Sequence, residues 1–314
     1  MSLSRRRFIS ITAGLALGAL AKPAHGKPAV WRGVALGANA ELVISDLPKD
    51  QANTLITLAI AEIKRLEAIF SIYCSDSVIM KLNRTGKLEA PPPELLALLT
   101  QVDAVHKATG GLFDPTIQPL WAAYAEHKGL PPADLLEAAR IRTGWKHVKY
   151  APTSIFFEKR AMALTLNGIA QGYVTDRIAD LLRANGLTNA VVNIGEISAL
   201  GHNSDALPWR ISLADEAERE TSDYVEISNR SIATSAPTGT TFDGEVSHII
   251  NPLTGKTTTS QWQRVSVIHD RAAIADGLST AMVMMAADDM LRATKVFNGV
   301  NVNARTKDGD ILRL

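Results

Sequence analysis

The segment AIADGLSTAM brings together two side chains that suit a hard metal ion. Asp276 and Thr280 lie four residues apart at the expected start of a helix, so their carboxylate and hydroxyl share one face. Mg²⁺ takes oxygen ligands and is commonly held by one or two carboxylates, with waters and substrate phosphates completing its shell. A helix without a metal would suit the same residues, with Asp276 favouring the helix dipole and Thr280 bonding back to a carbonyl. Both interpretations stay open.

His248 has surroundings that suit acid–base chemistry. It lies in GEVSHIINPLTGK, in a short predicted strand before the turn NPLTG, and an imidazole titrates near neutral pH. It could be a general base or a hydrogen-bonded structural histidine. The remaining histidines show neither a motif context nor metal-ligand spacing.

Two glycines bracket the start of another predicted helix, in the segment LNGIAQGY from Leu166 to Tyr173. The first N–H groups of a helix have no partner within it and the dipole is positive there, so a phosphate could bind at this end. Glycine would let such a ligand approach the backbone closely. Tight packing of the helix against a strand would need the same glycines.

Two stretches are dense in turn and aromatic residues, namely SIYCSDSVIMKLN from Ser71 and TGGLFDPTIQPL from Thr109. Their Tyr73 and Phe113 could flank a planar ring, although aromatic side chains also fill cores.

Helix signals gather early in the chain and strand signals late. Two strands are expected around Gly37, followed by a helix whose apolar face carries Ala59, Ile63, Leu66 and Phe70. Short apolar runs separated by turns begin near Trp145, and a further helix is predicted from Ala275 to Ala287. This order favours an α+β fold of mixed or antiparallel sheets with packed helices, with an internal boundary near residue 145.

The first 26 residues have the pattern of a twin-arginine signal peptide, with SRRRFIS, an apolar run and a small-residue end. The rest, residues 27–314, is expected to form the functional part, exported to the periplasm. The chain has 33 basic and 32 acidic side chains and no long run of one sign, which argues against nucleic-acid binding. Its single cysteine excludes an internal disulfide.

In their order along the chain, the five segments quoted above resemble the motifs of the ApbE family of FAD:protein FMN transferases over nearly all of residues 27–314. The segments NIGEISALG and TSAPTGTTFD are most similar to the NosX branch, whose members are associated with maturation of nitrous oxide respiration. The resemblance implies an α+β fold with FAD in a cleft. It also implies Mg²⁺-dependent cleavage of FAD, transfer of FMN to a Thr or Ser hydroxyl of an acceptor protein, and release of AMP.

The resemblance also implies residue roles. Magnesium would be held by the carbonyl of Gly168 with Asp276 and Thr280, and His248 would be the catalytic base. The contacts to FAD would come from Leu36, Tyr73, Leu112, Phe113, Asp114, Thr165, Gln171 and Ile250. The chain departs from the family pattern where Thr165 replaces a frequent Asp, Leu36 a frequent Met, and Asn251 the Asp of the IIDP motif.

The expected partner is an acceptor flavoprotein, membrane-anchored and respiratory. Two other functions use the same residues. Water in place of the acceptor hydroxyl would make the protein a metal-dependent FAD pyrophosphatase that releases free FMN. Without turnover it would be a flavin-binding assembly factor for a respiratory complex.

The arginine pair gives a first test of the signal. We expect Arg5→Lys combined with Arg6→Lys to leave the precursor in the cytoplasm, because the export machinery recognises the arginine pair of the signal. Cell fractionation and immunoblotting measure this. An unchanged periplasmic yield would show that export does not use the pair.

Overall fold

The structure, a computed structural model, describes residues 28–45, 47–213 and 223–314, so the predicted signal peptide lies outside the described residues. Its helices are α1 Lys49–Phe70, α2 Val78–Thr85, α3 Pro93–Ala108, η1 Pro115–Ile117, α4 Gln118–Glu126, α5 Ala133–Arg140, η2 Trp145–His147, α6 Ala170–Ala184, α7 Ala272–Met282 and α8 Ala287–Thr294. Its strands are β1 Ala29–Ala35, β2 Ala38–Ile44, β3 Lys87–Glu89, β4 Val148–Ala151, β5 Ser154–Phe157, β6 Ala190–Ile194, β7 Ile197–Leu200, β8 Trp209–Ser212, β9 Tyr224–Ile227, β10 Arg230–Ser235, β11 Thr241–Phe242, β12 Val246–Ser247, β13 Trp262–His269, β14 Asn301–Thr306 and β15 Ile311–Arg313.

An eight-stranded sheet forms the centre of the molecule, in the order β1-β2-β6-β7-β10-β13-β14-β15. Every neighbouring pair in it is antiparallel. The edge strand β1 alternates between more and less exposed residues, whereas β7 is buried throughout, as its central place requires. The predicted α+β class with packed helices is therefore confirmed.

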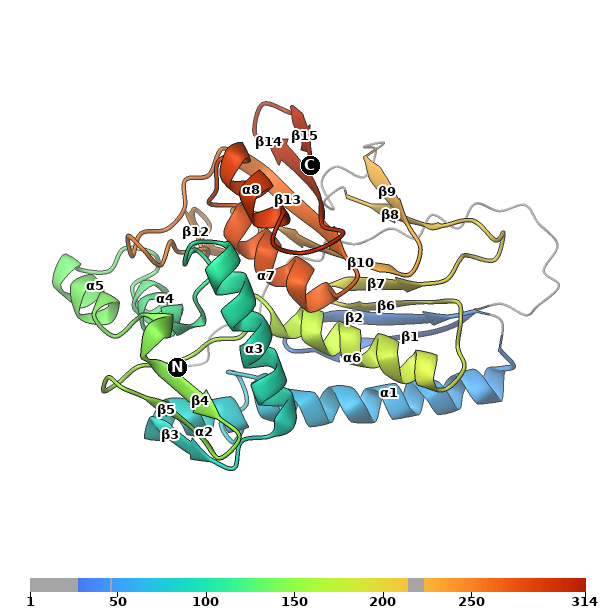
Figure 1. The fold of residues 1–314 in the computed structure, drawn as a ribbon, viewed down its shortest axis with the longest axis horizontal. Helices are drawn as coiled ribbons and strands as arrows, with labels where there is room; N and C mark the ends of the chain where they lie inside the picture. The colour runs from blue at the N-terminus through green and yellow to red at the C-terminus, as the bar shows by residue number, and fades with distance from the viewer. Residues whose placement is uncertain (1–27, 46, 214–222) are drawn as a thin grey trace.

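Helices cover one face of this sheet, and a hairpin covers the other (Figure 1). α1, α6 and α7 pack on the first face, where α7 lies against β10 and β13. The hairpin β8–β9 closes the opposite face over a separate apolar cluster that includes Trp209, Ile211 and Ile232. Both faces of the central strands are thereby shielded from water.

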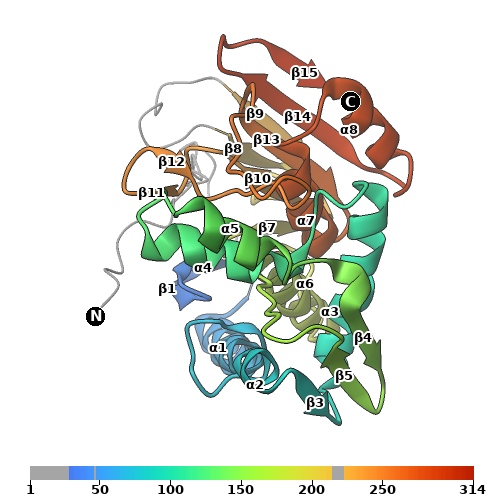
Figure 2. The same ribbon diagram turned by 90° about the vertical axis from the view of Figure 1, so that its left-hand side faces the viewer.

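A smaller unit lies beside the sheet. Figure 2 shows α4 and α5 next to the hairpin β11–β12. These elements share their own apolar cluster, in which Leu120, Tyr124, Phe242 and Ile250 are buried. The Tyr124 hydroxyl donates to the Gly255 carbonyl at 3.1 Å, which ties the turn after β12 to α4. His248 follows β12 and lies between the two cores, because the next residue, Ile249, packs in the main core and Ile250 packs in the smaller one.

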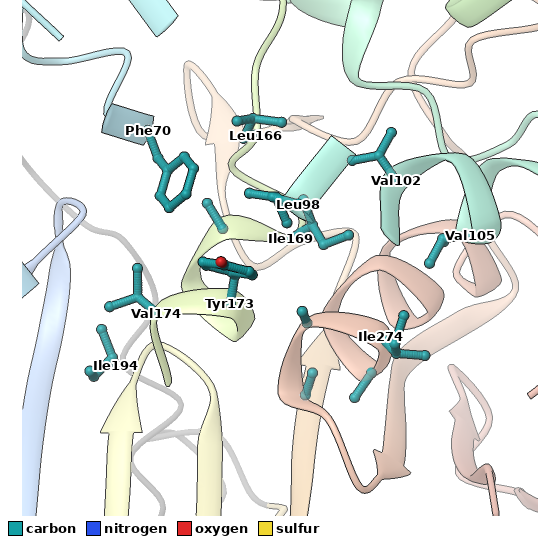
Figure 3. Packing of buried hydrophobic residues seen from close by; sticks show 14 of the residues in the cluster. Phe70, Leu98, Val102, Val105, Leu166, Ile169, Tyr173, Val174, Ile194 and Ile274 are labelled. Atoms are coloured by element: carbon teal, nitrogen blue, oxygen red, sulfur yellow. The ribbon is translucent and has the colours of Figure 1, made fainter. Parts of the chain in front are cut away.

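The start of α6 packs inside the main core (Figure 3). Ile169 and Tyr173 lie among Phe70 at the end of α1, Val102 of α3 and Ile274 of α7. The rings of Phe70 and Tyr173 meet edge to face, with centroids 5.4 Å apart. This packing fixes where the first turn of α6 points.

One predicted helix has different ends in the structure. α7 begins at Ala272 and ends at Met282, so the expected helix from Ala275 to Ala287 was wrong at both ends. A turn at residues 283–286 separates it from α8. The early start depends on a carboxylate from another helix, which local sequence does not reveal. No helix in the described residues is long and apolar enough to cross a membrane.

Candidate active site

The site begins where the first turns of α6 and α7 cross. A Cβ atom on Gly172 would come within 2.4 Å of the Ala272 carbonyl oxygen, so only glycine fits between the two backbones. The predicted tight packing at this glycine is therefore present, although the partner is α7 and not a strand. Gly168 has different neighbours: a Cβ there would lie 3.1 Å from the Thr280 hydroxyl and 3.4 Å from the Phe113 ring.

Asp276 links the two helices. Its Oδ2 atom accepts the Gly172 N–H at 3.2 Å, while its Oδ1 atom accepts no hydrogen bond from the described residues. Burial raises the pKa of Asp276 to about 8, the Gly172 N–H opposes this rise, and the nearby Asp176 carboxylate adds to it. A buried carboxylate with one unpartnered oxygen suits a bound cation.

The carbonyl of Gly168 has no hydrogen-bond partner among the described residues. Gly168 precedes the N-cap residue Ile169, so its carbonyl lies before the first acceptor within α6. The Gly172 N–H, which has no acceptor within the helix, donates to Asp276, and the Gly168 oxygen accepts no hydrogen bond from any described residue. The carbonyl is thus available to a ligand at the start of α6.

Thr280 supplies the third oxygen. Its hydroxyl lies 3.5 Å from the Ser235 hydroxyl, and it makes no bond back to a helix carbonyl; Ser279 instead donates to the Asp276 carbonyl at 3.0 Å. Ser235 also lies 2.8 Å from the Ser279 hydroxyl. The alternative in which Thr280 bonds back to a helix carbonyl is therefore not seen. Gly168 lies against Thr280, and Asp276 lies one helical turn before Thr280 on α7.

Two further carboxylates lie close by and were not predicted. Asp176 of α6 is 2% exposed and accepts N–H groups at the start of α7. Glu196, half-buried in the turn between β6 and β7, accepts a backbone hydrogen bond from Thr234, and burial together with the Asp276 charge raises its pKa. Asp176 lies four residues after Gly172, on the same face of α6, and that spacing was the available sequence signal.

His248 is held in one orientation. Its Nδ1 atom lies 2.6 Å from the Thr240 carbonyl, which can only accept, so Nδ1 carries the proton and Nε2 keeps its lone pair. Burial lowers the pKa of His248, and the bond to Thr240 partly opposes this. The ring is therefore neutral at pH 7 and able to accept a proton.

The aromatic stretches meet the loop before α6. The Asn167 amide donates to the Tyr73 hydroxyl at 3.1 Å, and the Thr165 N–H donates to the Pro115 carbonyl at 2.8 Å. Asp114 is occupied inside its own loop, because it accepts bonds from Thr116 and from the Trp145 N–H. Its carboxylate thus shapes the loop that carries Leu112 and Phe113.

Leu36 occupies a strained backbone position. Its φ is 48°, in the left-handed region that is rare for a leucine, and the following Gly37 has φ 82° in the same turn between β1 and β2. The Glu67 carboxylate of α1 accepts the Leu36 N–H at 2.6 Å and holds the turn. Strain of this kind clusters at ligand-binding sites.

The remaining predicted contacts lie in different surroundings. Gln171 packs its amide against Gly195, where a Cβ atom would come within 2.7 Å of that amide. Ile250 is 5% exposed within the small apolar cluster of α4 and β11. Asn251 accepts the Leu253 N–H at 2.9 Å, so its amide oxygen takes the turn-forming role open to an aspartate.

Comparison with known proteins places this geometry in a family. The ApbE family profile matches residues 36–303. The chain belongs to the ApbE family. Its curated relatives include proteins named FAD:protein FMN transferase from Vibrio cholerae, 29% identical over 68% of each chain, and from Chlamydia pneumoniae, 30% identical over 72% of this chain and 74% of the relative.

Solved structures agree with this family. The flavin transferase ApbE from Vibrio cholerae has a TM-score of 0.80 at 26% identity, covering 92% of this chain and 96% of that one. The ApbE protein from Thermotoga maritima has the same TM-score and identity over 91% of this chain and 97% of its own. The ApbE-like fold expected from the motifs is thereby confirmed.

The two glycines of the α6 start give a contrasting pair of variants. We expect Gly172→Ala to lower the free energy of unfolding by about 1–3 kcal/mol, because its methyl group meets backbone that cannot yield. Gly168→Ala meets only side-chain ends, so we expect a loss below about 1 kcal/mol with weaker FAD binding. Urea denaturation and flavin fluorescence titration measure the two effects. Equal stability of both variants would contradict the assigned packing.

Proposed function

We propose that the protein transfers FMN from FAD to a Thr or Ser hydroxyl of an acceptor protein, with Mg²⁺ held by Gly168, Asp276 and Thr280. The carrying observation is that the Gly168 carbonyl and one Asp276 oxygen accept no hydrogen bond from the described residues where α6 crosses α7, and that Gly168 lies against Thr280. Membership of the ApbE family supports flavin transfer as the activity.

The donor set fits magnesium. A carboxylate, a hydroxyl and a backbone carbonyl are all hard oxygen ligands, and Mg²⁺ completes its shell with waters and substrate phosphates. The described residues contain no group of three or more His, Cys, Asp or Glu that could hold a metal, so no softer site competes within them. When bound, the ion would neutralise charge on the FAD diphosphate.

The start of α6 would face that diphosphate. Its first N–H groups and positive dipole end favour an anion, and Gly168 keeps the approach open. Leu36, Tyr73, Leu112, Phe113, Asp114, Thr165, Gln171 and Ile250 are the proposed FAD contacts. Thr165 offers FAD a neutral hydroxyl. A carboxylate at this position would accept a hydrogen bond roughly twice as strong.

His248 would remove the proton from the acceptor. The hydroxyl oxygen attacks the phosphorus on the FMN side, its proton passes to Nε2 of His248, and the bond to the AMP oxygen breaks. AMP leaves, and the flavin stays attached to the acceptor through a phosphoester. The Thr240 carbonyl keeps the imidazole in the tautomer that this step requires.

The cellular setting is part of the proposal. The arginine-rich start supports export by the twin-arginine route and action in the periplasm. The segments NIGEISALG and TSAPTGTTFD support a place in the NosX branch, with a membrane-anchored respiratory flavoprotein as acceptor.

Substitutions at the metal site and at the base separate binding from turnover. We expect Asp276→Ala to lose Mg²⁺ binding, lower FAD affinity and reduce flavin transfer to background, because it removes the sole carboxylate assigned to the ion. His248→Ala should leave FAD affinity nearly intact and slow transfer by roughly 10²–10⁴-fold. Mass spectrometry of an acceptor peptide incubated with protein, FAD and Mg²⁺ measures covalent flavin.

The same samples discriminate between the possible functions. Free FMN with no flavin on the peptide would identify a pyrophosphatase, and FAD binding without either product would identify an assembly factor. Thr57→Ala, at an exposed position of helix α1, serves as a surface control. Covalent flavin at the wild-type rate in Asp276→Ala would refute the metal site.

The raised pKa of Asp276 predicts proton release on metal binding. At pH 7 this carboxyl, with a pKa of about 8, holds a proton that Mg²⁺ must displace. The apparent affinity for Mg²⁺ should therefore rise with pH and level off above about pH 8. Calorimetry in two buffers with different ionisation enthalpies measures the released proton. Identical heats in both buffers at pH 7 would show that Asp276 is already ionised.

A further inference from the structure

The first turn of α7 is held by a residue of another helix. Its N-cap residue Arg271 makes no side-chain cap, although the first N–H groups of a helix need external acceptors. Asp176 of α6 supplies both acceptors: its Oδ1 accepts the Ala272 N–H at 2.7 Å and its Oδ2 accepts the Ala273 N–H at 3.0 Å. With Asp176 only 2% exposed, water does not compete for these bonds.

A second bridge runs in the opposite direction. Asp276 of α7 accepts the Gly172 N–H of α6 at 3.2 Å. Each helix thus contributes one aspartate to the first turn of the other, and the close contact of Gly172 with Ala272 lies between the two bridges. Sliding of one helix along the other would break both carboxylate bridges.

We propose that Asp176 is a positioning residue for the metal site. By holding the first turn of α7 on α6, it sets where Asp276 and Thr280 stand relative to the Gly168 carbonyl. Asp176 uses both of its oxygens on α7, so it acts through that helix and not as a ligand. The inference rests on the magnesium site of the proposed function.

The neighbouring Asp180 offers a matched control. Arg271 approaches Asp176 with its Nε at 3.4 Å and Asp180 with its Nη1 at 2.9 Å. Asp180 thus shares the helix and the arginine with Asp176. It accepts no helix N–H from α7, and its side chain is 39% exposed. Replacing Asp180 removes an ion pair with Arg271 and keeps both carboxylate bridges between α6 and α7.

The test is Mg²⁺ binding by metal-free protein without FAD, measured by calorimetry. Asp176→Asn keeps the size of the side chain but turns an amide N–H₂ toward one of the two helix N–H groups. We expect its dissociation constant for Mg²⁺ to rise by about 10–100-fold, as for other residues that orient metal ligands. Asp180→Asn should change it by less than about fivefold, the size of an exposed ion pair. Saturating Mg²⁺ should restore most flavin transfer in Asp176→Asn.

The direction in which Asp176→Asn changes the dissociation constant for Mg²⁺ distinguishes a positioning role of Asp176 from an effect of its negative charge. Removing a negative group beside Asp276 would by itself favour the ionised Asp276 and tighten Mg²⁺ binding. Unchanged or tighter binding in folded Asp176→Asn would therefore overturn the positioning role. If that variant does not fold, Asp176→Glu carries the test, because it keeps the charge and displaces the carboxylate; weaker binding is expected, and wild-type affinity would overturn the proposal.

Mg²⁺ binding by Asp276→Ala tests the magnesium site separately from the positioning role of Asp176. Loss of Mg²⁺ binding in Asp276→Ala together with unchanged binding in Asp176→Asn would overturn the positioning role alone. Unchanged binding in Asp276→Ala would overturn the magnesium site on which that role rests.

Discussion

Two helix N-termini point at each other where α6 meets α7, and the rest of the site depends on this contact. Both ends carry unpaired N–H groups and partial positive charge, so their approach would be unfavourable without acceptors between them. Asp176 and Asp276 supply those acceptors from opposite helices, and Gly172 removes the side chain that would hold the backbones apart. The N–H groups of Gly172, Ala272 and Ala273 are thereby satisfied within the protein.

The hydrogen bond from Gly172 to Asp276 connects packing with chemistry. It stabilises the helix pair by satisfying an N–H group that has no acceptor within α6. The Gly168 carbonyl and the second oxygen of Asp276 accept no hydrogen bond from the described residues, and Gly168 lies against the Thr280 hydroxyl. An unsatisfied carbonyl and a desolvated carboxylate are both unfavourable alone, so a cation that contacts them together recovers free energy already lost in folding.

Local spacing identified Asp276, Thr280 and His248 as candidates, because a shared helix face and a turn motif are visible in a few consecutive residues. It left two uses open for the glycines of LNGIAQGY, and the structure divides them: Gly172 serves packing, while Gly168 faces Thr280 and Phe113. Asp176, Glu196 and Ser235 escaped prediction because their roles arise from contacts between distant segments, such as the Asp176 bonds to Ala272 and Ala273. The same bonds explain why the start of α7 could not be placed from sequence.

The proposed base lies where two apolar clusters meet. The residues that follow His248 divide between them, since Ile249 packs in the main core with the apolar residues of α7, whereas Ile250 packs with α4 in the smaller cluster. The segment that carries His248 is therefore anchored in both clusters, and a change in the packing of either one would displace the imidazole relative to the helix that carries Asp276 and Thr280.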